Sequence, residues 1–189
     1  MAETPEEKMI EDNLKENKEN KKKGIFFINS TFTDELLEYL FLDIKKAIDD
    51  KNIAEITIYI NSNGGQTSTL FPLADLISSS KTPINTIVLG KAYSAGAMLL
   101  LSGTAGHRSA YKHANILLHE VASDYGYNKN SQTKEYSLHL DRINKELIKM
   151  VKEKTKMKPA EIEKYFNSNK DIFINANQAL KYKIIDKII

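Results

Sequence analysis

The sequence contains no cysteine and very little arginine. The absence of cysteine excludes disulfides, cysteine-ligated zinc or iron–sulfur sites and thiol catalysis, and it is compatible with the reducing cytosol. Of the 27 basic side chains only Arg108 and Arg142 are arginines, and 25 acidic side chains nearly cancel the positive charge. Nucleic-acid binding usually requires an uncompensated basic surface, often with arginine to bind phosphates. The composition therefore disfavours a nucleic-acid partner.

Long hydrophobic runs are also missing. The longest strongly apolar stretch, residues 95–101, is far too short to span a bilayer, which takes about 20 residues. Residues 1–5 contain no apolar core of the kind that a secretory signal needs. We expect a soluble protein of the cytoplasm with no membrane partner.

The apolar and aromatic content predicts a folded domain. Hydrophobic residues make up 41% of the 189 residues, with 7 Phe and 9 Tyr, which excludes a wholly disordered or fibrous chain. Residues 1–23 differ from the rest, because they hold many acids and lysines and few large apolar side chains. We expect this segment to be a solvated tail, disordered or a frayed helix, with a docking arm for a partner as the alternative. Residues 24–189 then form one domain.

Beyond Gly24 the hydrophobic pattern alternates between strands and helices. Buried strands bounded by turn residues are expected first, and the segments between them have helical spacing. Strands separated by helices of this length pair in parallel through right-handed crossovers. The sequence thus predicts an α/β fold with strands at 25–28, 55–60, 84–89, 114–118 and 171–174, and helices after Thr33, around 68–79, from about 94, over 136–150 and from 159 to about 166.

Unusual residues follow the predicted strands where a ligand site is expected. In open parallel sheets that site lies beyond the carboxyl ends of the strands. These ends carry residues 61–65, residues 90–94 and His119. Ser94 stands in a turn of small residues between a strand and a helix, which exposes its hydroxyl and leaves room for a substrate. The alternative for Ser94 is an ordinary N-cap serine.

Three further positions could support chemistry at a serine. Gly64 and Gly65 could aim a backbone N–H into the cleft, or could form a simple turn. His119 has the proton affinity of a general base near neutral pH, or could be a satisfied histidine in the core or on the surface. Asp171 could orient a histidine, or could cap a turn. On the residues alone other acids could serve as well, among them Asp124, Asp141 and Asp186.

Four segments, in this order and at these separations, resemble the proteolytic subunit of the Clp protease. The first is a strand with a Gly-Gly loop, the second contains Ser94, the third leads to His119, and the fourth begins at Asp171. They are residues 59–65, residues 90–100, residues 103–108 with 114–119, and residues 171–176 with 179–180 and 184–186.

The resemblance implies a crotonase-like fold, a spiral of βαβ units with a helical handle region. It also implies a serine endopeptidase that hydrolyses unfolded proteins or peptides without a metal or organic cofactor. Ser94 would attack the peptide carbonyl, His119 would transfer the proton and Asp171 would hold the imidazole. The backbone N–H groups of Gly65 and Ala95 would form the oxyanion hole.

The resemblance further implies a homo-oligomer, a heptameric ring that could stack as a tetradecamer, and a possible AAA+ unfoldase partner. A body of this size cannot enclose a proteolytic chamber alone. Several positions depart from the family pattern and bear on ring stacking, substrate alignment and unfoldase docking. They are Asn63 in place of proline, Ala95 in place of methionine, residues 120–127 in place of Gln-Pro and a glycine-rich strand, Asn169-Lys170 in place of Asp-Arg, and residues 1–23 in place of the gating loop.

Two other functions remain open at this point. The altered segment after His119 and the unusual N-terminus would fit a non-catalytic structural subunit that assembles with an active partner. A crotonase-type acyl-CoA enzyme would use the paired backbone N–H groups for an enolate, although the Ser/His/Asp set disfavours it.

Overall fold

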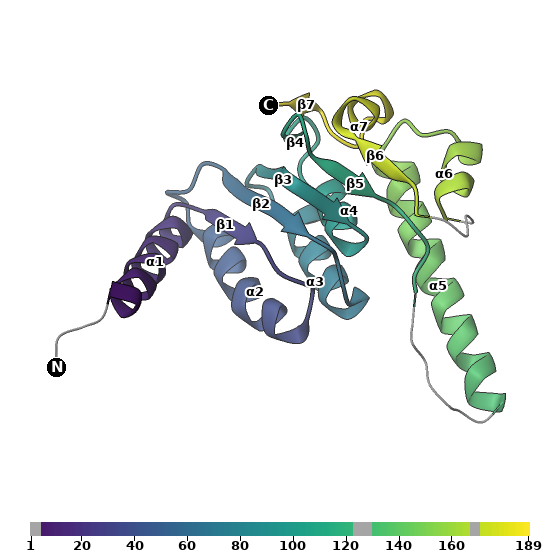
Figure 1. The fold of residues 1–189 in the computed structure, drawn as a ribbon, viewed down its shortest axis with the longest axis horizontal. Helices are drawn as coiled ribbons and strands as arrows, with labels where there is room; N and C mark the ends of the chain where they lie inside the picture. Colours follow the sequence, from purple (N-terminus) through teal and green to yellow (C-terminus); the bar gives the residue numbers. More distant parts are fainter. Residues whose placement is uncertain (1–4, 123–129, 167–170) are drawn as a thin grey trace.

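The computed structural model describes residues 5–122, 130–166 and 171–189, and its centre is a seven-stranded sheet (Figure 1). The main path of the sheet has the order β1-β2-β3-β4-β7, with β5 paired to β3 and β6 paired to β5. The strands are β1 (Ile25–Ile28), β2 (Ile56–Ser62), β3 (Ile84–Tyr93), β4 (Arg108–Ala110), β5 (Asn115–Leu117), β6 (Phe173–Asn175) and β7 (Lys187–Ile188).

Helices alternate with the first strands and dominate the C-terminal third. They are α1 (Pro5–Lys22), α2 (Asp34–Asp49), α3 (Thr67–Ser78), α4 (Ala95–Ser102), α5 (Asn130–Lys154), α6 (Pro159–Phe166) and α7 (Ala176–Tyr182). The expected helices α2, α3, α4 and α6 are confirmed to within a few residues. The helix expected over 136–150 is also present, as α5, but it begins six residues earlier and ends four residues later. Side chains cap two of the helices: Thr33 accepts from the N–H of Leu36 at the start of α2, and Asn175 and Gln178 form a capping box at α7.

The predicted parallel pairing is confirmed. β1, β2 and β3 pair in parallel, as do β3 with β4 and β3 with β5, whereas β6 runs antiparallel to β5. β4 and β7 were not predicted from the sequence, since three and two residues are too few to show an alternating pattern. The mixed α/β fold expected from the sequence is therefore the observed one.

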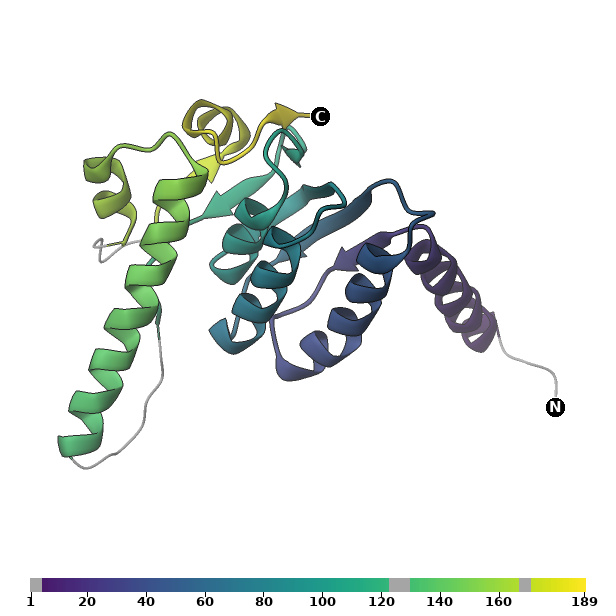
Figure 2. The same cartoon turned by 180° about the vertical axis from the view of Figure 1, so that it is seen from behind.

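Helices α2, α3 and α4 cover one face of the sheet, the face turned to the viewer in Figure 2. Every second side chain of β2 is fully buried under them, and the alternate ones are half-buried. On the opposite face of β1 and β2, Phe27 is 38% exposed and stacks on Tyr59 with ring centroids 5.0 Å apart. Among the described helices, none covers this second face (Figure 1).

The charged N-terminal segment forms helix α1 from Pro5 to Lys22, and the C-terminal part of this helix contacts α2. Lys21 forms an ion pair of 2.8 Å with Asp43 and lies 3.5 Å from the centre of the Tyr39 ring. Asn17 donates a hydrogen bond of 2.9 Å to the Tyr39 hydroxyl. A helix thus stands where a disordered tail or a frayed helix was expected, and the division of the chain after residue 23 stays a prediction.

A buried ion pair joins three parts of the C-terminal half. Arg108 of β4 is 5% exposed and donates from Nε and Nη2 to the two carboxylate oxygens of Asp186, over 2.9 and 3.0 Å. Its Nη1 donates to the carbonyl of Lys154, the last residue of α5. Burial alone would raise the pKa of Asp186, but the hydrogen bonds and the charge of Arg108 outweigh it and lower that pKa below 3.8.

None of the helices within the described ranges combines the length and hydrophobicity that a bilayer span requires.

Candidate active site

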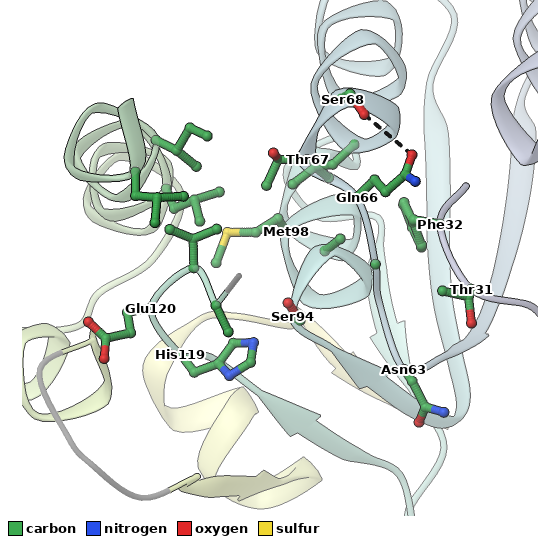
Figure 3. Close-up of a pocket in the computed structure, with 18 of the residues that line it drawn as sticks. Thr31, Phe32, Asn63, Gln66, Thr67, Ser68, Ser94, Met98, His119 and Glu120 are labelled. Atoms are coloured by element: carbon green, nitrogen blue, oxygen red, sulfur yellow. Dashed lines mark hydrogen bonds between the residues drawn. The ribbon is translucent and has the colours of Figure 1, made fainter. Parts of the chain in front are cut away.

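Ser94 occupies a tight turn between β3 and α4. Its backbone has φ 54° and ψ −121°, a conformation that residues with a Cβ rarely adopt. The N–H of Ser94 donates to the carbonyl of Leu117 over 2.9 Å, which fixes the turn to the end of β5. The side chain makes no capping hydrogen bond, so the alternative of an ordinary N-cap serine is not supported. The hydroxyl is free to face the cavity (Figure 3).

Gly64 allows the loop after β2 to lie directly against this turn. At its φ of +89°, an added Cβ would be 2.5 Å from the carbonyl oxygen of Tyr93 and 2.7 Å from the Cβ of Ser94. Gly65, at φ +145°, is similarly close to the backbone of Phe32. Glycine is therefore required at both positions, because any side chain would separate the loop from its neighbours.

Two backbone N–H groups at the cavity, those of Gly65 and Ala95, donate no backbone hydrogen bond to any described residue. The bridge between Phe32 and Gly65 employs the carbonyl of Gly64 and the N–H of Gln66, which leaves out the N–H of Gly65. Ala95 is the first residue of α4, where an N–H has no acceptor within the helix. The positive end of the helix dipole lies at the same place. This edge of the sheet can therefore stabilise a negative charge.

The antiparallel pairing of β5 with β6 places His119 opposite Asp171. Leu117 pairs with Phe173, so continuing the register by two residues in each direction brings these two side chains together. His119 Nδ1 lies 3.4 Å from Asp171 Oδ1, and the two side chains are 27% and 58% exposed. This distance allows an electrostatic contact but exceeds the usual range of a hydrogen bond.

Ser94 and His119 line one cavity of about 640 Å³. Figure 3 shows the two side chains close to each other, with Met98 further along the same wall. No hydrogen bond between Ser94 and His119 is formed in the described part of the chain, and catalytic hydrogen bonds are often long before substrate binds. Helices α3 and α5 add Leu70, Leu140, Ile143 and Leu147 to the apolar part of the cavity wall.

The remaining acids considered from the sequence lie in different environments. Asp186 is paired with Arg108, and Asp141 is an exposed residue of α5. Asp124 lies outside the described residues, as do Asn169-Lys170 and all but the first three residues of the altered segment 120–127. Those first three, Glu120, Val121 and Ala122, line the cavity.

Sequence reasoning missed the contribution of α5 to this cavity. Its apolar spacing was recognised, but that pattern shows only which face of a helix is buried and not what it covers. Asn144, whose Oδ1 accepts a hydrogen bond from the N–H of Val121, was missed as well. An asparagine inside an apolar helical face was the available signal.

The comparisons with known proteins identify the class of the chain. A family model described as Clp protease matches residues 11–189. The ATP-dependent Clp protease proteolytic subunit 1 of Shouchella clausii (strain KSM-K16) is 33% identical over 171 residues, which cover 89% of this chain and 86% of that protein. The ATP-dependent Clp protease proteolytic subunit of Carsonella ruddii (strain PV) is 27% identical over 168 residues, covering 89% and 84%.

The chain belongs to the Clp protease family, as the resemblance predicted. It is a serine-type endopeptidase on a mixed α/β fold. Membership of the Clp protease family argues against the alternative function of an acyl-CoA enzyme.

Proposed function

We propose that Ser94, His119 and Asp171 are the catalytic triad, and that the chain cleaves peptides or unfolded proteins with them. One observation carries the proposal: the sheet register brings the three residues to one edge. Tyr93 pairs with Leu117, which pairs with Phe173, so Ser94, His119 and Asp171 each lie one or two residues beyond a paired position.

Catalysis begins with a peptide bound in the cavity beside Ser94. The Ser94 hydroxyl attacks the carbonyl carbon while His119 accepts its proton, and Asp171 stabilises the imidazolium that forms. The tetrahedral oxyanion lies between the N–H groups of Gly65 and Ala95. The two N–H groups support this oxyanion hole because neither donates a backbone bond to another described residue. Losing one donor of this kind typically costs about 10²–10³ in kcat.

The second half of the reaction reverses these proton transfers. His119 gives its proton to the leaving amine, which departs and leaves an ester on Ser94. Water then attacks that ester as His119 accepts a proton from it. The acid product leaves and the Ser94 hydroxyl is restored, with no metal or organic cofactor in any step.

The triad is tested by labelling with a fluorophosphonate and intact mass spectrometry of the assembled protein. The wild type is expected to gain one adduct and Ser94→Ala none. Ser79→Ala, at the far end of α3 where the hydroxyl bonds the carbonyl of Leu76, is the control and should label normally. Labelling of Ser94→Ala would refute the nucleophile, and an unlabelled wild type would favour the non-catalytic subunit.

We also propose that the chain works as a homo-oligomeric ring of the cytoplasm, heptameric and able to stack as a tetradecamer, with an AAA+ unfoldase as partner. Parallel sheets are nearly always covered on both faces, and no described helix covers the face that carries Phe27 and Tyr59 (Figure 1). The cavity at Ser94 is also an open cleft of one chain, so confinement of the site would come from neighbouring copies.

A further inference from the structure

Asn144 is a polar residue in the apolar face of α5. It lies four residues after Leu140 and three before Leu147, so it shares their side of the helix. Leu147 is only 5% exposed, and Asn144 itself is half-buried. An amide in such a place is costly unless it is hydrogen-bonded, so its partner is informative.

That partner is the segment that follows His119. The N–H of Val121 donates to Asn144 Oδ1 over 2.7 Å, a short bond between residues far apart in sequence. The Val121 side chain faces the same cavity as Ile143 and Leu147 of α5. The bond therefore holds the cavity wall of α5 against the chain two residues beyond His119.

His119 thus stands between two fixed points of the backbone. Two residues before it, the carbonyl of Leu117 accepts from the N–H of Ser94 over 2.9 Å. Two residues after it, Val121 is held by Asn144. The first contact holds the backbone before His119 against the turn that contains Ser94. The second holds the backbone after His119 against α5.

We propose that Asn144 is a positioning residue, which orients His119 toward Ser94 by holding the backbone of Val121. This inference rests on the proposed role of His119 as general base. The side chain of Asn144 does not line the cavity, so it acts through the segment it holds and not through the substrate.

Two substitutions separate positioning from stability. Asn144→Leu keeps the approximate size, suits the apolar face and removes the acceptor. Asn144→Asp keeps an oxygen acceptor in the same place. A small misplacement of a catalytic group can cost about 10²-fold in rate. With a short fluorogenic peptide and the assembled full chain, Asn144→Leu should lower kcat ten- to a hundredfold, with KM changed less than about twofold.

Asn144→Asp should restore most of kcat, whereas Lys145→Ala, on the exposed side of α5, should match the wild type. Thermal unfolding is measured in parallel, because Asn144→Leu leaves the N–H of Val121 without its acceptor and can lower the midpoint. The loss of kcat should appear at a temperature where the variant is still fully folded. In a His119→Ala background, Asn144→Leu should cause no further loss of fluorophosphonate reactivity, since both changes act on one group.

The results distinguish failure of this inference from failure of the proposed function. If His119→Ala is inactive and Asn144→Leu retains wild-type kcat, Asn144 does not position the base. A raised KM with unchanged kcat would also overturn the inference, because it would assign Asn144 to substrate binding. If His119→Ala remains fully active, the triad itself is wrong.

Discussion

Position 64 controls how closely the loop after β2 approaches the turn that contains Ser94. Gly64 has a positive φ, and neighbouring backbone leaves no room for a side chain: an added Cβ would lie 2.5 Å from the carbonyl oxygen of Tyr93. Gly106 has the same φ of +89° but nothing within 4 Å of an added Cβ. The two glycines therefore separate backbone strain from steric overlap.

We expect Gly64→Ala to destabilise the protein more than Gly106→Ala does. Strain alone costs about 1–3 kcal/mol, and only Gly64→Ala must also move the backbone at Ser94. Fluorophosphonate labelling should therefore be lost in Gly64→Ala and kept in Gly106→Ala. Urea unfolding gives the stability and intact mass gives the label. Equal effects of the two substitutions on both measurements would contradict the packing argument.

The residues alone pointed to Ser94, Gly65 and His119 because each follows a predicted parallel strand. They left the choice of the acid open. Asp171 and Asp186 both adjoin short apolar segments. In the structure the register of β5 and β6 brings Asp171 to His119, whereas Asp186 is paired with Arg108. Such a register depends on contacts distant in sequence, so the resemblance to a family had to supply the assignment.

At the scale of elements, the pair Arg108–Asp186 joins β4, the segment before β7 and the end of α5. Asp186 also accepts from the N–H groups of Gly106 and Arg108, over 2.9 and 3.2 Å. Breaking a buried pair by removing one partner typically costs about 3–5 kcal/mol, since the other charge is left without compensation. The position of α5, and hence one wall of the cavity, depends on this pair.

We expect Asp186→Asn to lower the free energy of unfolding at pH 7, and to do so less as the pH falls. The pKa of Asp186 is lowered in the folded state, so its carboxylate stabilises the protein above about pH 4, near its ordinary pKa of 3.8. That contribution is lost as the pH falls from 3.8 toward the lowered pKa. Urea unfolding between pH 7 and pH 3 measures the difference.

The matched control is Asp171→Asn, whose side chain is 58% exposed. It should leave the free energy of unfolding almost unchanged at either pH and reduce peptide hydrolysis strongly. A stability difference between Asp186→Asn and the wild type that stays constant down to pH 3 would show that the carboxylate charge is not the stabilising feature.

Elements with long periodic patterns could be predicted, and the shortest ones could not. α5 and β2 show their helical and alternating patterns over many residues. β4 and β7 pair with each other beside the Arg108–Asp186 contact, which joins residues far apart in the sequence and leaves no local pattern. α1 has mixed charge and little apolar surface, so its contact with Tyr39 and Asp43 of α2 was equally hidden.

At the scale of the whole molecule, no helix of the described chain covers the second face of β1 and β2 (Figure 1). If copies of the chain cover exposed surface in a ring, light scattering should give a stable multiple of the 21.4 kDa chain mass. The unfolding midpoint should rise with protein concentration, because assembly stabilises only the folded chain. A monomer with a concentration-independent midpoint would contradict the ring.

The backbone conformation of Ser94 costs stability at the position of the proposed nucleophile. At φ 54° a glycine would be under less strain than serine, yet glycine carries no hydroxyl. If Ser94 is the proposed nucleophile, folding favours glycine at this position whereas hydrolysis requires serine. The conflict also affects experimental design: Ser94→Gly would change stability and chemistry together, whereas Ser94→Ala keeps the Cβ and its strain and removes only the reacting oxygen.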